Sequence, residues 1–261
     1  MIDVGRLFDP YSRQARLYPA LLTLLPAIAL IVALVPALLG AGVGGELLAF
    51  ATSCGAVFLL ADISRALGKR IEPRLLFDWG GWPTTIALRH SSASLNPATK
   101  ARYHAFLGRN VTGLVIPTTQ YEQQHQIEAD DFYASAVDWL KEQCRGPDFA
   151  LLLRENATYG FRRNMLGLKP VALVVCAITV CVSTVILAAH SGLTFTSPHL
   201  FEKPSALSLS LAIVLIVALV AGSAWLILVR RSWVKKAADT YATTLLSCCD
   251  KLPDGNVGKQ P

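Results

Sequence analysis

Four long apolar segments divide this chain into two pairs on either side of a polar middle. They cover Tyr18–Leu39, Leu47–Ile63, Pro170–Ala189 and Ala206–Val229. A helix needs about 20 mostly apolar residues to cross a hydrocarbon core, and each segment approaches or exceeds that length. Helices satisfy their own backbone groups, which lipid cannot do, so we expect all four segments to be helical. The sequence therefore predicts an α-helical membrane protein with two transmembrane hairpins.

These spans set the domain organisation that we expect. A cytosolic N-terminal segment covers residues 1–17, the first hairpin 18–63, a middle domain 64–169, the second hairpin 170–229, and a C-terminal helix and tail 230–261. The middle stretch is long enough for one small domain. Its mixed patterns indicate a fold that is either α/β or mostly helical.

Positive charge lies almost entirely on one side of the spans. Of the 24 Lys and Arg residues, all except Lys203 belong to the N-terminal segment, the middle domain or the tail. The positive-inside rule therefore predicts cytosolic termini and a cytosolic middle domain, with external loops at Gly40–Glu46 and His190–Ser205. Anionic headgroups attract such basic flanks, so the net charge of +6 does not require a nucleic-acid partner.

Local patterns predict the elements of the middle domain. Thr84–Arg89 follows a glycine-rich turn and has the composition of a short strand. Asn96 before a proline is typical of a helix start, so a helix is expected over Ala98–Leu107. Apolar residues at helical spacing predict a second helix over Glu128–Gln143. Gly167–Pro170 reads as a connection to the third span.

The tail from Arg230 onward continues the fourth span as a helix in this interpretation. Trp233, Ala237, Tyr241 and Leu245 recur on one face of it. We expect that face to pack on the middle domain or on another subunit.

The spans carry no ionisable residue near their centres, which disfavours an ion-coupled transporter. They do carry small residues one helical turn apart, at Ala51 and Gly55 and at Ala218 and Gly222. Small residues let helix backbones approach closely. They indicate either packing within one four-helix bundle or packing between the subunits of a homo-oligomer, and the sequence leaves both open.

Two polar stretches of the middle domain are candidates for binding a ligand or partner. Their candidate residues are Arg89, His90, Arg102, His104, Arg154, Glu155, Tyr159, Arg162 and Arg163. Guanidinium groups suit phosphates, so a nucleotide or an anionic lipid headgroup is one possible ligand. The alternative is that the arginines anchor the chain to headgroups and pair with nearby acids. No glycine-rich phosphate-loop spacing is present.

Catalytic patterns are weak. Cys144 has Arg145 beside it but no assigned base, and the pair His125 and Glu128 is too small a set for a metal site. We therefore expect no enzyme activity, no cofactor and no bound metal.

The motifs Trp79–Thr85 with Leu88–His90, Thr99–His104 and Glu155–Asn164 resemble those of a group of bacterial four-span inner-membrane proteins without an established activity. The resemblance implies the bacterial inner membrane, with several passes and cytosolic termini. More loosely, the layout is similar to that of four-helix membrane effectors of anti-phage defence systems, in which a cytosolic sensor triggers membrane disruption.

The leading functional hypothesis is therefore an inner-membrane effector. Its cytosolic domain would recognise a ligand or partner, and its oligomerised helices would perturb or permeabilise the membrane, in anti-phage defence. One alternative is a non-conducting scaffold that recruits a cytosolic partner protein. A small transporter is a third and weaker reading.

Overall fold

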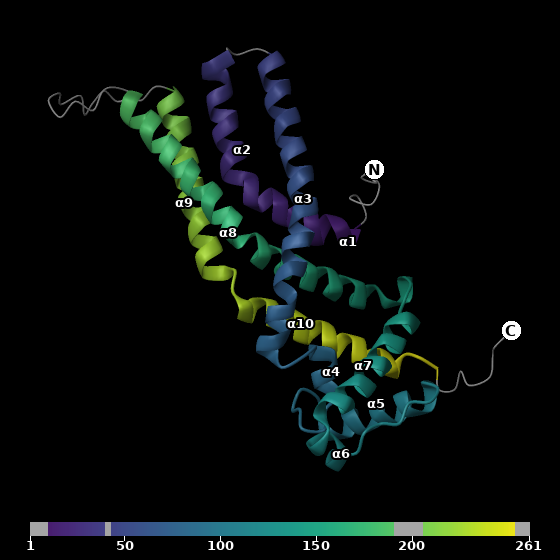
Figure 1. Cartoon of the computed structure of the whole chain (residues 1–261). Coiled ribbons are helices and arrows are strands. Elements are labelled where there is room, and N and C mark those ends of the chain that lie inside the picture. The colour runs from purple at the N-terminus through teal and green to yellow at the C-terminus, as the bar shows by residue number, and fades with distance from the viewer. Residues whose placement is uncertain (1–9, 40–42, 191–205, 254–261) are drawn as a thin grey trace. The chain divides into compact units, whose positions relative to one another are not determined.

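The computed structural model describes residues 10–39, 43–190 and 206–253 (Figure 1). Residues 1–9, 40–42, 191–205 and 254–261 lie outside it, and they include most of both predicted external loops and the ends of the two predicted terminal segments. Every regular element in the described ranges is a helix. Of the two folds predicted for the middle domain, α/β or mostly helical, the structure therefore agrees with the mostly helical one.

The chain forms two compact units, each assembled from two separate stretches of sequence. We call Met1–Ile71 with Gly160–Trp233 the membrane unit, and Glu72–Tyr159 with Val234–Pro261 the pocket unit. Two long helices, α3 (Val43–Trp79) and α8 (Ala150–His190), contribute residues to both units.

Four helices are long and apolar enough to cross a membrane, which confirms the predicted spans at this level. They are α2 (Tyr18–Leu39), α3, α8 and α9 (Ala206–Leu228). A short α1 (Pro10–Ser12) and a π-helical turn η2 (Arg13–Leu17) precede α2. Large apolar side chains are exposed along all four long helices, among them Leu25, Leu59, Val185 and Ile216. That surface suits hydrocarbon rather than water.

The pocket unit packs short helices around one apolar core. They are α4 (Pro83–Leu88), α5 (Pro97–Asn110), α6 (Thr119–Gln124), α7 (Gln126–Gln143), η3 (Pro147–Phe149), α10 (Arg231–Leu246) and η4 (Ser247–Asp250). Leu88, Leu107 and Leu140 lie in the core with Leu245 and Leu246, and all five are fully buried. Tyr241 and Leu245 of the predicted tail face therefore pack in this core, whereas Trp233, at the start of that face, packs against the core of the membrane unit.

Two helices predicted from the sequence are confirmed, and the structure shows the interactions that account for each. The Asn96 side chain accepts a hydrogen bond from the Thr99 backbone N–H at 2.8 Å and caps α5, as its position before Pro97 indicated. In α7, Ala129, Tyr133, Ala136 and Leu140 are buried on one face, at the spacing of the apolar stripe.

The strand predicted over Thr84–Arg89 is wrong, because this segment forms α4. Pro83 occupies the first helical turn, and the Ile86 N–H donates to the Trp82 carbonyl at 2.9 Å. Both threonines are buried, and α4 packs against α7. Tertiary burial here outweighs the strand preference of β-branched residues, which depends on context.

Two connections were also predicted wrongly. Gly167–Pro170 is not a linker, because α8 continues through it into the third span. A proline is tolerated where neighbouring helices support the backbone. Conversely, the tail is not continuous with the fourth span, because α9 ends at Leu228 and α10 begins at Arg231.

The interior of the membrane unit contains a close crossing of α3 and α8. A Cβ added at Gly167 would lie 2.7 Å from the Gly68 nitrogen and from the Leu67 carbonyl carbon. Beside the crossing, the Asn164 amide donates to the Ala15 carbonyl at 2.7 Å and is almost fully buried. The two helices are in backbone contact at this point, which only glycine permits.

Candidate functional site

A buried carboxylate organises the connection between α4 and α5 in the pocket unit. Glu122, from α6, accepts the backbone N–H groups of His90 at 2.7 Å and Ser91 at 3.1 Å. It also accepts the hydroxyl groups of Ser91 at 3.0 Å and Tyr133 at 2.8 Å. One side chain therefore fixes the backbone just after α4.

The protonation of this group follows from its partners. Burial alone would raise the pKa of Glu122, but the hydrogen bonds from His90, Ser91 and Tyr133 outweigh it and lower the pKa below its ordinary value. Burial and the bond to Glu122 raise the pKa of Tyr133. The pair is thus a carboxylate and a protonated phenol at neutral pH.

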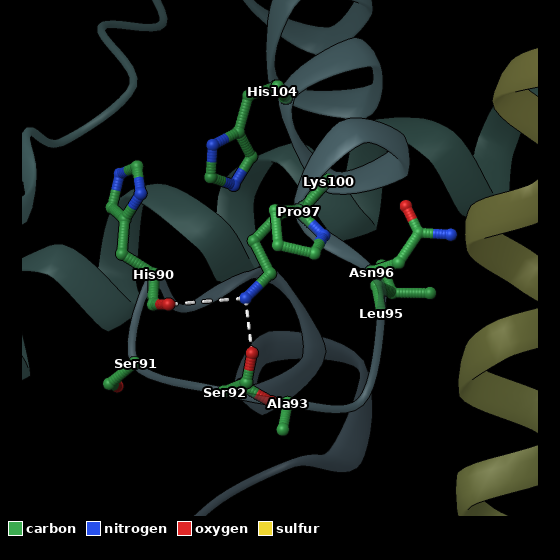
Figure 2. Close-up of a pocket in the computed structure, with 10 residues that line it drawn as sticks. His90, Ser91, Ser92, Ala93, Leu95, Asn96, Pro97, Lys100 and His104 are labelled. Carbon is green, nitrogen blue, oxygen red and sulfur yellow. Dashed lines mark hydrogen bonds between the residues drawn. The ribbon is translucent and has the colours of Figure 1, made fainter.

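Lys100 fixes the same connection from the opposite direction. Its Nζ donates to the carbonyl oxygen of Arg89 at 2.6 Å. It also donates to the carbonyl oxygens of His90 at 3.3 Å and of Ser92, and Figure 2 shows these two bonds. Burial lowers the pKa of Lys100. Three acceptors nevertheless require all three N–H groups, so the ammonium form is the one that fits. Lys100 is consequently a structural cation that has no spare donor for a ligand.

Two histidines lie side by side in this region, with ring centroids 4.9 Å apart. His90 Nε2 bonds the Pro117 carbonyl at 2.8 Å, and His104 Nε2 bonds the Leu88 carbonyl at 2.7 Å. A carbonyl oxygen only accepts, so Nε2 carries a proton in both rings. Burial lowers the pKa of His104 and keeps that ring neutral.

These groups border an open pocket of about 640 Å³. Its lining runs along the connection from His90 to Asn96 and onto the first turns of α5 as far as His104 (Figure 2). No arginine or carboxylate belongs to this lining, and the Lys100 ammonium is fully bonded. Serine hydroxyls, the Asn96 amide and imidazole nitrogens suit a neutral hydrogen-bonding group, such as a nucleobase edge, better than a phosphate.

The burial of His104 predicts that the pocket unit becomes less stable at acid pH. Its pKa in the folded state lies below the ordinary 6.5, so the unfolded state binds the proton more readily. Stability should therefore fall as the pH drops below about 6.5, by up to about 1.4 kcal/mol per pH unit. Thermal unfolding of the full chain between pH 7.5 and 5.5 measures this dependence. His104→Gln should flatten it, whereas His125→Gln, at an exposed site, should leave it unchanged.

The predicted ligand residue Arg89 is engaged within the protein. It holds Asp130 with two bonds, Nε to Oδ1 at 2.8 Å and Nη2 to Oδ2 at 2.6 Å, and it donates to the Gly80 carbonyl at 2.8 Å. The bonds to Asp130 raise the pKa of Arg89. A Cβ on Gly81, at φ +128°, would lie 3.3 Å from Nη2. Gly81 thus lets this arginine reach the turn after α3.

Arg102 lies apart from the pocket lining and pairs with Asp250 at the end of α10 and η4. Its Nε and Nη2 donate to the two carboxylate oxygens at 2.9 and 3.0 Å, and the Tyr103 hydroxyl adds a bond at 2.8 Å. The hydrogen bond from Arg102 lowers the pKa of Asp250, and burial raises that of Tyr103 to about 12. A phosphate ligand would have to displace this carboxylate.

The second predicted stretch is divided between the units. In the pocket unit, Arg154 is exposed, Glu155 is half-buried, and the buried Tyr159 hydroxyl donates to Glu72 at 2.9 Å.

In the membrane unit, Arg162 donates to the Trp233 carbonyl at 3.0 Å, and the buried Arg163 bonds Asn164. Of the nine predicted binding residues, only His90 and His104 line the pocket.

The small residues of the spans have two different environments. A Cβ on Gly222 would be 3.6 Å from the Cβ of Cys176, and Ala218 is buried, so this pair packs inside the membrane unit. Ala51 and Gly55 are exposed, and no atom lies within 4 Å of a Cβ built on Gly55. The bundle therefore leaves one of the two small-residue faces open.

Comparison with known proteins adds no relative. No protein-family model, no curated protein and no solved structure matches the chain. The function must be argued from the molecule itself.

The sequence analysis missed Lys100 and Glu122 as the residues that shape the pocket. A serine-rich stretch at Ser91–Ser94, directly before a capped helix, is the signal that could have pointed to a structured loop. Within the described ranges, no group of three or more His, Cys, Asp and Glu side chains could hold a metal ion.

Proposed function

We propose that this protein is a membrane effector of anti-phage defence, in which the pocket unit recognises a ligand or partner and the spans associate to perturb the bilayer. The observation that carries the proposal is the pairing, in one chain, of a pocket lined by serine, asparagine and histidine as well as apolar side chains with four apolar helices. The pocket supplies a place for a signal. The helices supply the response in the inner membrane, with both termini in the cytosol.

The open face of α3 supports self-association. Ala51 and Gly55 form a surface on which a second helix can approach closely, and Thr52 between them satisfies its hydroxyl on the Leu48 carbonyl at 2.8 Å. A neighbouring subunit therefore meets no unpaired hydroxyl there. Close backbone approach is the main source of helix association in lipid.

The full chain, purified in lipid, tests the proposal by native mass spectrometry together with planar-bilayer recording. An oligomer that conducts, alone or after nucleotides or infected-cell extract are added, supports it. A silent monomer or dimer under every condition rejects pore formation.

Gly55→Leu should shift the oligomer toward monomer by at least tenfold in apparent dissociation constant, because a branched side chain separates the helix backbones. Ala177→Leu provides the control, since Ala177 is exposed on α8 and has no Gly, Ala, Ser or Thr one turn away. Native mass spectrometry over a dilution series measures the shift. Equal behaviour of the two variants would exclude this face as the subunit contact.

A scaffold that recruits a cytosolic protein is the second candidate, and one observation favours it. Phe77, Val115 and Ile127 of the pocket unit are 86%, 71% and 82% exposed. Each of these side chains offers apolar area that a protein partner would bury. A scaffold would copurify with a soluble protein and show no conductance.

A further inference from the structure

The membrane unit contains an apolar groove that neither the pocket nor the self-association surface uses. Its volume is about 500 Å³, and side chains of α2, α8 and α9 form its walls. On α9 the lining extends from Ile216 to Leu228, which corresponds to about 18 Å of helix, and Val229 follows directly after it. The groove is therefore long and narrow, and almost wholly apolar.

One end of the groove is marked by aromatic and cationic side chains. Trp233 and Phe161 both line it, with ring centroids 6.0 Å apart. The Arg162 guanidinium lies 5.0 Å from the Trp233 ring centroid. Tryptophan and arginine together are typical of the level where hydrocarbon gives way to headgroups.

Arg162 retains hydrogen-bonding capacity at this position. Its Nη1 donates to the Trp233 carbonyl at 3.0 Å, and no carboxylate of the described residues pairs with it. Arg230 is exposed in the two-residue break between α9 and α10. Nearby, Lys169 donates to the Leu226 and Val229 carbonyls at 3.2 and 2.8 Å, which satisfies the end of α9 and adds positive charge. The polar end of the groove is thus complementary to an anion.

We propose that this groove binds one acyl chain of an anionic phospholipid, with the phosphate held by Arg162 and Arg230. The groove is built from span residues, so lipid hydrocarbon is the medium that surrounds it. An apolar slot that ends beside guanidinium groups not paired with a described carboxylate matches a molecule with an acyl chain and a phosphate. This site is independent of the proposed effector activity.

Native mass spectrometry of the full chain tests the site, after incubation with phosphatidylglycerol or phosphatidylcholine of identical acyl chains. The wild type should retain phosphatidylglycerol at least tenfold better than phosphatidylcholine. The double variant Arg162→Gln with Arg230→Gln should retain both equally. Arg74→Gln, which removes an exposed charge that does not line the groove, should behave as wild type.

Filling the groove gives a second readout. Ala224→Trp should lower the retention of both lipids, because the indole occupies the slot, whereas Leu219→Trp, at an exposed position of α9 outside the lining, should not. Equal retention of the two lipids by the wild type would overturn the proposal. So would unchanged selectivity in the double arginine variant, which leaves every residue of the groove lining in place and does not depend on the folding of Ala224→Trp.

Discussion

Gly167→Ala should destabilise the membrane unit by about 3 kcal/mol, which lowers the unfolding temperature of the full chain by about 10 °C. The added methyl group would lie 2.7 Å from backbone atoms of Leu67 and Gly68 on α3. Backbone cannot rotate away as a flexible side chain can, so α3 and α8 must separate. Tryptophan fluorescence during heating in lipid nanodiscs measures the change.

The matched control is Gly44→Ala, also in a membrane-unit helix, where a Cβ would meet nothing within 4 Å. Alanine favours a helix over glycine, so this variant should be as stable as the wild type or slightly more so. Gly222→Ala, with its nearest neighbour at 3.6 Å, should have a small effect. A Gly167→Ala protein that melts within about 2 °C of Gly44→Ala would show that the crossing is not tightly packed.

Glu122→Ala should open the connection between α4 and α5. The substitution leaves the N–H groups of His90 and Ser91 and the Tyr133 hydroxyl without their acceptor. Buried donors without partners should together destabilise this region by about 3 kcal/mol. Hydrogen exchange at the His90 and Ser91 amides is the direct measurement, and protection should fall by about 100-fold.

Acid should reproduce the effect in the wild type. The pKa of Glu122 is lowered by folding, so its contribution is complete above the ordinary 4.5 and is lost as the pH falls through the lower, folded value. Glu122→Gln keeps one acceptor and should remove the part of the acid dependence that lies below pH 4.5, while the part due to His104 remains. Glu142→Ala, which removes a carboxylate that is 59% exposed, should leave protection at His90 unchanged. Equal protection in the two alanine variants would contradict a structural role for Glu122.

The features that could be predicted from sequence are those encoded within a few helical turns. The spans follow from uninterrupted apolar length, and the start of α5 follows from Asn96 beside Pro97. Thr84 and Thr85 misled the analysis because their strand preference is weak and α4 is buried against α7. The sequence analysis predicted a linker at Gly167, because the close contact that explains this glycine is made with Gly68 on another helix.

The candidate site was predicted less well, and for a related reason. The sequence identifies arginines that can bind phosphate, but it does not reveal that Arg89 holds Asp130 or that Arg102 holds Asp250. Glu122 reaches backbone N–H groups more than thirty residues away along the chain, and backbone donors carry no side-chain signature. Ion pairs between segments far apart in the sequence occupy Arg89 and Arg102, and the sequence alone does not reveal such pairs.

The division of the pocket unit between two stretches of sequence has a consequence for biosynthesis. Its core needs Leu245, Leu246 and Cys248, which follow α9 in the chain. Because a ribosome makes the chain from its N-terminus, residues 72–159 must wait for the whole second hairpin before their core is complete. A nascent protein therefore finishes its pocket unit only after α9 has been translated, so translation order separates the making of the long apolar helices from the completion of the pocket unit.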